Sequence, residues 1–159
     1  MKDYRVGLGF DVHRFSRKKK DLVLGGVKIP FSKGLEAVSD GDVILHAVTD
    51  ALCGATSLGD IGDYFPPQSK ESKGIDSKKI VKFIFKRIVD RFKIINIDVT
   101  VIADKPALVS YKREIVKSLE NIFCISGVNL KIKSKEGLNI LGGSNAISCL
   151  ATVLVSEIG

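Results

Sequence analysis

The sequence has few of the features that would place a protein in a membrane, outside the cell or in a multidomain chain. No stretch reaches the ~18 consecutive apolar residues of a membrane span, and Met1 is not followed by the apolar segment of a secretory signal. No repeat, proline-rich linker or low-complexity tract interrupts the 159 residues. We therefore expect one catalytic domain over 1–159 with no membrane partner.

Cysteine is scarce and is not arranged in a motif. Cys53, Cys124 and Cys149 are odd in number, lack CxxC spacing and lie among apolar residues. This usage is typical of small buried thiols in a reducing compartment. It predicts a cytoplasmic location.

Positive charge is in excess and is spread along the chain. Lysine and arginine number 25 against 18 acidic residues, a net charge of +7 that makes an anionic partner reasonable. The densest basic run, residues 17–20, has no interleaved aromatic residues, and we interpret it as a solvated hairpin tip. An RNA-binding module is a further hypothesis, but no aromatic and basic strand motif of that kind is present. We expect no nucleic-acid partner.

Apolar periodicity predicts strands and helices in alternation. We expect extended segments at 4–12 and 22–29, paired as an N-terminal β-hairpin around the lysine run, and further strands at 97–103 and 128–136. We expect helices at 39–53, capped by Ser39, and at 76–92, 108–122 and 144–155. This order predicts an α+β fold with a ferredoxin-like or split βαβ sheet and helices on one face.

Both histidines have carboxylates at informative spacings. Asp11 and His13 are two apart, so on a strand they point to the same side. His46 is four residues from both Asp42 and Asp50, which places all three on one side of a helix. Two imidazoles and one carboxylate are a common catalytic zinc set. The alternative is a core histidine satisfied by Asp50, with His13 packed at a strand end.

Two glycine- and aspartate-rich turns flank the first predicted helix, and a polar strand lies near the C-terminus. Residues 39–42 and 59–66 have features of anion-binding turns, although a helix cap for the first and an ordinary turn for the second are the favoured explanations. Ser134 and Glu136 alternate with Lys133 and Lys135, so a hydroxyl and a carboxylate would share one face and could hold Mg²⁺. The lysines also fit protection of an edge strand.

Three blocks of the sequence together resemble the 2-C-methyl-D-erythritol 2,4-cyclodiphosphate synthases. The blocks are Gly9-Phe10-Asp11-Val12-His13, Ser39-Asp40-Gly41-Asp42-Val43 with Leu45-His46-Ala47, and Gly59-Asp60-Ile61-Gly62 with Phe65-Pro66. The resemblance implies a metal-dependent cyclase of the non-mevalonate isoprenoid pathway. Such a lyase converts 4-diphosphocytidyl-2-C-methyl-D-erythritol 2-phosphate to the cyclic diphosphate and CMP. It also implies a homotrimer with active sites between subunits.

The resemblance also implies roles for particular residues. Asp11, His13 and His46 match zinc ligands, and Glu136 matches the holder of a second cation, Mg²⁺ or Mn²⁺. The expected catalytic residues are Asp60, Ser39, Ser134 and Glu136. The residues expected to bind the cytidine diphosphate substrate are Ile61, Gly62, Phe65, Ala103, Lys105, Pro106, Leu108, Ile132 and Lys133.

Three positions depart from the family pattern. Val38 stands where a histidine is usual, Lys133 replaces a threonine, and residues 139–146 lack the arginine and phenylalanine associated with a central isoprenoid-diphosphate cavity. A second hypothesis is therefore a catalytically silent trimer that binds metal and CDP.

Overall fold

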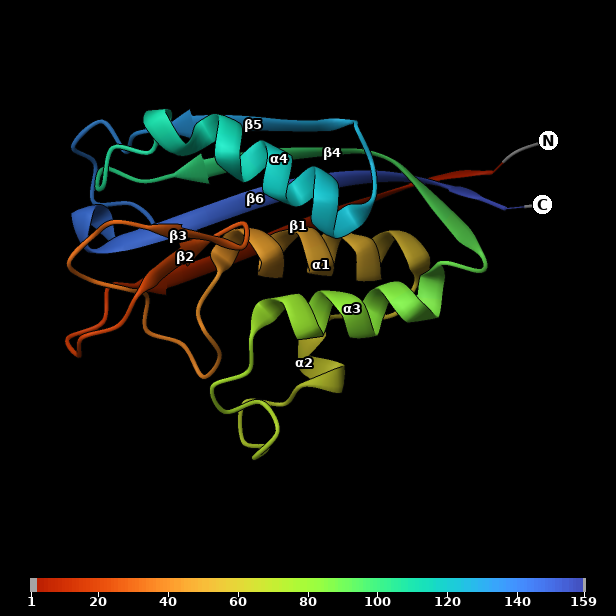
Figure 1. Cartoon of the computed structure of the whole chain (residues 1–159), viewed down its shortest axis with the longest axis horizontal. Helices are drawn as coiled ribbons and strands as arrows, with labels where there is room; N and C mark the ends of the chain where they lie inside the picture. Colours follow the sequence, from red (N-terminus) through yellow and green to blue (C-terminus); the bar gives the residue numbers. More distant parts are fainter. Residues whose placement is uncertain (1–2, 159) are drawn as a thin grey trace.

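The computed structural model describes residues 3–158 as one mixed sheet, a small separate hairpin and a helical layer (Figure 1). The strands are β1 (Tyr4–Arg14), β2 (Leu22–Leu24), β3 (Val27–Ile29), β4 (Phe92–Ile102), β5 (Val128–Lys133) and β6 (Ala146–Glu157). The helices are α1 (Val43–Thr56), α2 (Ile61–Tyr64), α3 (Ser77–Ile88) and α4 (Lys112–Phe123), with short 3-10 turns η1 (Val109–Tyr111) and η2 (Gly143–Asn145). The α+β class is confirmed. Within the described residues, no helix is long and apolar enough to cross a bilayer.

The strand order in the main sheet is β1-β6-β4-β5. β6 runs antiparallel to both β1 and β4, so β1 and β4 are parallel strands separated by β6, which is a split βαβ unit. β4 and β5 are parallel and adjacent, so the second crossover is not split. As a result, β1 and β5 form opposite edges of the sheet.

Two predictions of secondary structure are wrong. The segment 4–12 does not pair with 22–29: β1 pairs with β6, while β2 and β3 form their own hairpin about a Gly25-Gly26 turn with positive φ at both residues. The predicted helix 144–155 is instead strand β6. Its residues are buried on both faces over much of its length, and such a run cannot be told from a buried helix by periodicity.

Other elements lie where expected but with different ends. Asp42, not Ser39, caps α1, which continues through Gly54 to Thr56, and Asp76 caps α3. β4 begins five residues before the predicted start, at Phe92, and β5 ends at Lys133. Ser134 and Glu136 consequently lie in the loop after β5.

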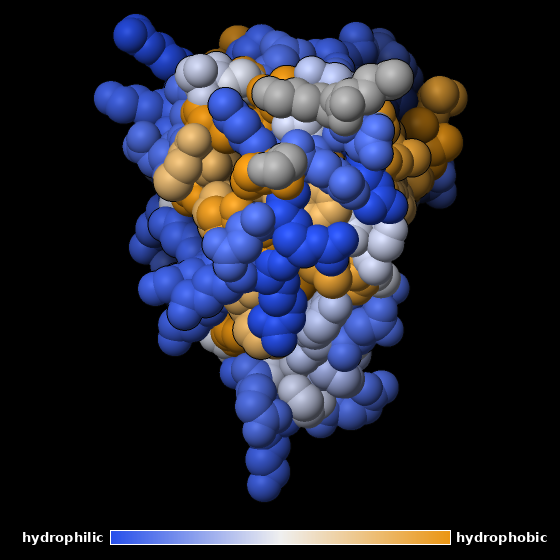
Figure 2. Space-filling view, turned by 90° about the vertical axis from the view of Figure 1, so that its right-hand side faces the viewer, coloured by the Kyte–Doolittle hydropathy of each residue, from blue (hydrophilic) through white to orange (hydrophobic). Residues whose placement is uncertain are grey.

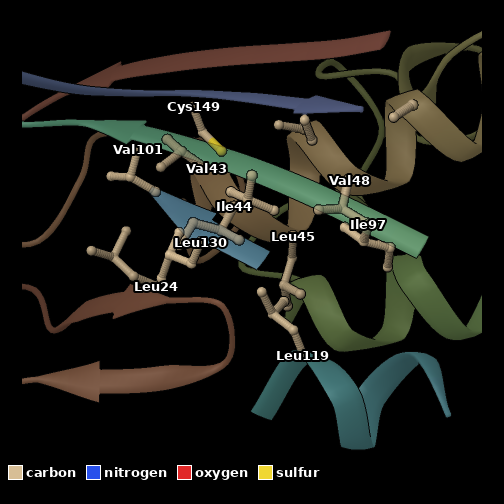
Figure 3. Packing of buried hydrophobic residues seen from close by; sticks show 14 of the residues in the cluster. Leu24, Val43, Ile44, Leu45, Val48, Ile97, Val101, Leu119, Leu130 and Cys149 are labelled. Atoms are coloured by element: carbon tan, nitrogen blue, oxygen red, sulfur yellow. The ribbon is translucent and has the colours of Figure 1, made fainter. Parts of the chain in front are cut away.

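The core lies between the sheet and the helices, with Leu45, Ile97 and Leu119 among its fully covered side chains (Figure 3). α1 packs directly on β1. The contact is so close that a Cβ atom on Gly9 would stand 1.9 Å from the carbonyl oxygen of Ala47. The other face of β1 carries exposed apolar side chains: Tyr4, Val6, Leu8, Phe10 and Val12. The end of the molecule near the termini is covered mainly by hydrophilic residues, with smaller apolar areas between them (Figure 2).

Candidate metal centre and nucleotide segments

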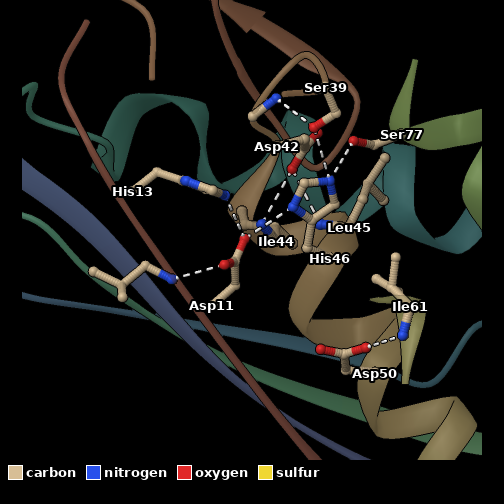
Figure 4. A network of polar contacts seen from close by, with 12 residues as sticks. Asp11, His13, Ser39, Asp42, Ile44, Leu45, His46, Asp50, Ile61 and Ser77 are labelled. Carbon is tan, nitrogen blue, oxygen red and sulfur yellow. Dashed lines mark hydrogen bonds and ion pairs between the residues drawn. The ribbon is translucent and has the colours of Figure 1, made fainter. Parts of the chain in front are cut away.

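The candidate metal ligands come together where β1 meets α1. Gly7, Gly9, Asp11 and His13 alternate on one face of β1; the glycines let α1 approach, and the two polar residues then lie beside His46 on that helix (Figure 4). Asp11, His13 and His46 offer ligand atoms that all lie within 4.8 Å of one another. The close contact of strand and helix is what assembles this cluster.

One carboxylate oxygen joins the two imidazoles. Asp11 Oδ2 lies 3.1 Å from His13 Nε2 and 2.9 Å from His46 Nδ1. Burial alone would raise the pKa of Asp11, but hydrogen bonds from both histidines lower it to about 2. Burial alone would lower the pKa of His46, but the hydrogen bond and charge of Asp11 raise it. Two nitrogens and one ionised oxygen facing one point fit a divalent zinc ion.

The far side of the His46 ring is held by two serines. His46 Nε2 lies 2.9 Å from Ser77 Oγ and 3.2 Å from Ser39 Oγ. Ser77, which is fully buried, donates hydrogen bonds from its hydroxyl and its amide to the carboxylate of Asp40. Ser77 was not predicted as part of the site, because it lies 31 residues from His46 in the sequence.

The two carboxylates that are four residues from His46, Asp42 and Asp50, lie outside the candidate ligand cluster. Asp42 is fully buried and accepts hydrogen bonds from four backbone amides, those of Gly25, Gly26, Ile44 and Leu45. It fixes the β2–β3 turn to the start of α1. Asp50 accepts from the amide of Ile61 and not from His46, so the alternative of a histidine satisfied by Asp50 is wrong.

A pocket of about 250 Å³ opens beside the cluster. Its lining includes Asp11, His13, His46, Ser39, Ile61, Gly62 and Phe65. Asp60 is exposed just before Ile61, and its carboxylate caps α2 by accepting from the amide of Asp63. Val38 also lines the pocket. The structure thus brings the predicted substrate-binding residues Ile61, Gly62 and Phe65 next to the predicted metal ligands.

The predicted nucleotide-binding segments meet each other at the other edge of the sheet. The amide of Ala103 donates to the carbonyl of Lys133, and the amide of Lys135 donates to Asp104. Ser134 Oγ donates to the carboxylate of Glu136. β5 and β1 are opposite edges of the sheet, and among the described residues Glu136 is not part of the Asp11 cluster.

Lys135 also differs from the prediction made from the sequence. We expected it beside Lys133 on the strand surface, but Lys133 is exposed whereas Lys135 is 1% exposed. Its ammonium donates to the carbonyls of Leu141, Gly143 and Ala146, and thus closes the loop between β5 and β6. Burial lowers the pKa of Lys135. No spacing in the sequence distinguishes this lysine from its exposed neighbours.

Fold and site define an α+β protein with a candidate metal centre of two histidines and one aspartate between a strand and a helix. The model of the YgbB family matches residues 4–156, and the chain belongs to that family. Among its relatives, a 2-C-methyl-D-erythritol 2,4-cyclodiphosphate synthase of Treponema denticola is 46% identical over 154 residues, covering 95% of each chain. One of Clostridium acetobutylicum is 44% identical, covering 95% of this chain and 99% of its own.

Solved structures give the same relationship. The chain matches IspF of Plasmodium falciparum in complex with CDP with a TM-score of 0.83 and 31% identity, covering 98% of this chain and 97% of the other. It also matches the bifunctional IspDF of Campylobacter jejuni with a TM-score of 0.93 and 32% identity, covering 99% of this chain but 43% of that one. The resemblance inferred from the three sequence blocks is confirmed.

Proposed function

We propose that this chain is a 2-C-methyl-D-erythritol 2,4-cyclodiphosphate synthase. It converts 4-diphosphocytidyl-2-C-methyl-D-erythritol 2-phosphate to the cyclic diphosphate and CMP. The observation that carries the proposal is the Asp11, His13 and His46 cluster beside the 59–65 segment, in a chain 46% identical to a synthase of that name over nearly its full length. The whole of 1–159 is proposed as the catalytic domain, and its free thiols favour the cytoplasm.

Asp11, His13 and His46 are proposed to hold one zinc ion, and Glu136 a Mg²⁺ or Mn²⁺ ion. Such cations supply Lewis-acid polarisation and neutralise phosphate charge when bound. The serines behind His46 fix the orientation of its ring, as outer hydrogen bonds commonly do for metal-binding histidines. Ser39 is also proposed to contact substrate phosphate from the pocket side.

The reaction needs no protein nucleophile. An oxygen of the 2-phosphate attacks the β-phosphorus, the bond from that phosphorus to the bridging oxygen breaks, and CMP leaves with the electron pair. The chain contributes by positioning the two phosphates in line. Asp60, with Ile61, Gly62 and Phe65, is proposed to bind the methylerythritol hydroxyls. Ser134 and Glu136 hold the diphosphate, and the cytidine lies among Ala103, Lys105, Pro106, Leu108, Ile132 and Lys133.

We also propose a homotrimer with active sites between subunits. Three observations support it. The triad lies at edge strand β1 and Glu136 follows edge strand β5, three strand spacings or roughly 14 Å away, so one chain does not unite them. The 250 Å³ pocket is also small for a whole nucleotide substrate, because such pockets usually reach about 300 to 1,000 Å³. The exposed apolar face of β1 supplies surface for such an assembly.

The direct test is a CMP-release assay with zinc, Mg²⁺ and the cytidylyl substrate. The proposal predicts equal amounts of CMP and cyclic diphosphate, the latter identified by ³¹P NMR. Folded, metal-loaded protein that releases neither product would favour the catalytically silent trimer that binds metal and CDP. The departures from the family pattern at Val38, Lys133 and 139–146 are the reason for that alternative. Chains carrying His46→Ala and Glu136→Gln, unfolded and refolded together, should regain part of the activity if the site is shared. No recovery would contradict intersubunit sites.

A further inference from the structure

A cavity that lies outside the proposed catalytic site is strongly basic. It has a volume of about 1050 Å³ and forms around the loop after β1, at the end of the molecule away from the termini (Figure 1). Six cationic side chains line it, with one carboxylate: Arg14, Arg17, Lys18, Lys19, Lys20 and Lys33, and Glu36. We call this cavity the basic basin. The lysine run interpreted as a solvated tip is one of its walls.

Most of this charge has no protein partner. In residues 3–158, no carboxylate lies within 4 Å of the charged groups of Arg17, Lys18, Lys19 or Lys33. Arg14 meets Glu36 only at 3.9 Å, and both side chains are largely exposed. Cationic groups that line one cavity and lack carboxylate partners attract anions, so the basin favours an anionic ligand.

The walls of the basin are fixed by backbone contacts. The amide of Phe15 donates to the carbonyl of Asn145, and the amide of Ser16 donates to the carbonyl of Gly34. The rings of Phe15 and Phe31 pack with their centroids 5.4 Å apart. The basic loop is thus fixed at its start, where Phe15 and Ser16 donate hydrogen bonds to two other loops.

The basic basin adjoins the metal pocket. Ala37 lines both cavities. Lys20 Nζ donates to the carbonyl of Ser39 over 2.8 Å, and Ser39 contacts His46 on the other side. Arg14 directly follows His13 in β1. An anion bound in the basin would therefore lie next to the pocket that Asp11, His13 and His46 line.

We propose that the basic basin binds the polyphosphate part of small anionic ligands and collects the substrate for the metal pocket. This rests on the proposed function, whose substrate carries a diphosphate and a further phosphate. A cleft lined by one sign of charge concentrates oppositely charged ligands and raises association rates by about 10 to 10³-fold, an effect that salt removes. The basin attracts the phosphate groups of the substrate but does not fix the orientation of its nucleoside.

The test removes two charges from the basin and, as a matched control, two from elsewhere. Lys18→Gln/Lys19→Gln alters the basin, whereas Lys82→Gln/Lys86→Gln alters exposed lysines on α3 by the same net charge. Inorganic tripolyphosphate, titrated calorimetrically into the full chain with EDTA present, reports binding without requiring turnover. We expect roughly tenfold weaker binding at low salt for the basin pair, a smaller salt slope and little change for the control. Equal weakening by both pairs would overturn the proposal.

A second readout uses the reaction itself. We expect the basin pair to lower kcat/KM at low ionic strength and to leave kcat unchanged, with the difference from the parent chain vanishing at high salt. If the chain has no cyclase activity, the proposed function fails while the tripolyphosphate titration still decides the anion site. Loss of single-stranded RNA binding in the basin pair with unchanged tripolyphosphate binding would overturn the proposal in favour of RNA.

Discussion

His46 and Asp11, 35 positions apart in the sequence, are joined by a 2.9 Å contact between Nδ1 and Oδ2. The same oxygen lies 3.1 Å from His13 Nε2. The carboxylate of Asp11 therefore lies between the two imidazole rings. A bound cation would replace these two contacts with three metal–ligand bonds. The account of the site depends on this relationship.

Removing a ligand should differ from removing a substrate contact. We predict that His13→Ala and His46→Ala lose zinc and most activity, because each leaves two protein ligands. Asp60→Ala should retain zinc and lose turnover, since Asp60 is exposed and lies outside the ligand cluster. Zinc content after dialysis and CMP release measure the two effects. Equal metal loss in all three variants would contradict the division of roles.

Zinc affinity should fall at acid pH. The pKa of His46 is raised above 6.5 in the folded chain. The ion pair of protonated His46 with Asp11 therefore stabilises the metal-free fold fully below pH 6.5. This stabilisation is lost as the pH rises through the raised pKa. Zinc must displace that proton, so affinity should drop about tenfold per pH unit below the raised pKa. Competition with a chromophoric chelator on both sides of 6.5 measures this. A flat profile would exclude His46 as a ligand.

Ser77 should act as a positioning residue for His46. Ser77→Ala removes the hydroxyl 2.9 Å from Nε2 and should weaken zinc binding by about 10- to 100-fold, the usual effect of an outer hydrogen bond. Ser77→Thr keeps the hydroxyl and should restore affinity. Ser118→Ala, which removes a hydrogen bond to Gly25, serves as the control. An unchanged zinc affinity in Ser77→Ala with unaltered stability would refute the role.

Gly9 should be required for the strand and helix to meet. In Gly9→Ala the new Cβ would stand 1.9 Å from the carbonyl oxygen of Ala47, so α1 must move away from β1. We expect a destabilisation of about 1 to 3 kcal/mol or more, together with weaker zinc binding. Urea unfolding and zinc titration measure both. Gly74→Ala is the control, because an added Cβ there meets open space although the φ angle is positive. It measures the cost of backbone strain alone, without a steric clash.

Lys135 should organise the loop that displays Ser134 and Glu136. Lys135→Met leaves the carbonyls of Leu141, Gly143 and Ala146 without their donor. We predict weaker CDP binding, by roughly tenfold, because about 1 to 3 kcal/mol of hydrogen bonding is lost from that loop. Zinc binding at the opposite sheet edge should be unchanged, and exposed Lys93→Met should alter neither. Parallel loss of zinc and CDP would instead indicate general unfolding.

Local spacing predicted the Asp11 and His13 half of the metal cluster, because both residues lie on one strand, whereas His46 is 35 positions away and joins them through tertiary packing. Period-2 alternation placed Asp11 and His13 on one face, and the small residues of β1 and α1 brought His46 to them. Where one element fixes the direction of a side chain, the sequence is sufficient.

Long-range pairing was not predictable in the same way. The partner of β1 is β6, more than 130 positions away, and the small apolar residues of β6 fit a buried helix as well as a central strand. Asp42 was expected beside His46 but turned instead to the Gly25-Gly26 amides, a contact set by the β2–β3 turn. Ser77 and Lys135 acquired their roles only through tertiary packing.

The most direct test of the central claim is anomalous scattering at the zinc absorption edge, from crystals of the zinc-loaded chain. The account predicts one strong peak per chain, within about 2.0 to 2.2 Å of Asp11 Oδ2, His13 Nε2 and His46 Nδ1. A zinc-loaded crystal with no peak among these three atoms, or with zinc held by other side chains, would contradict it.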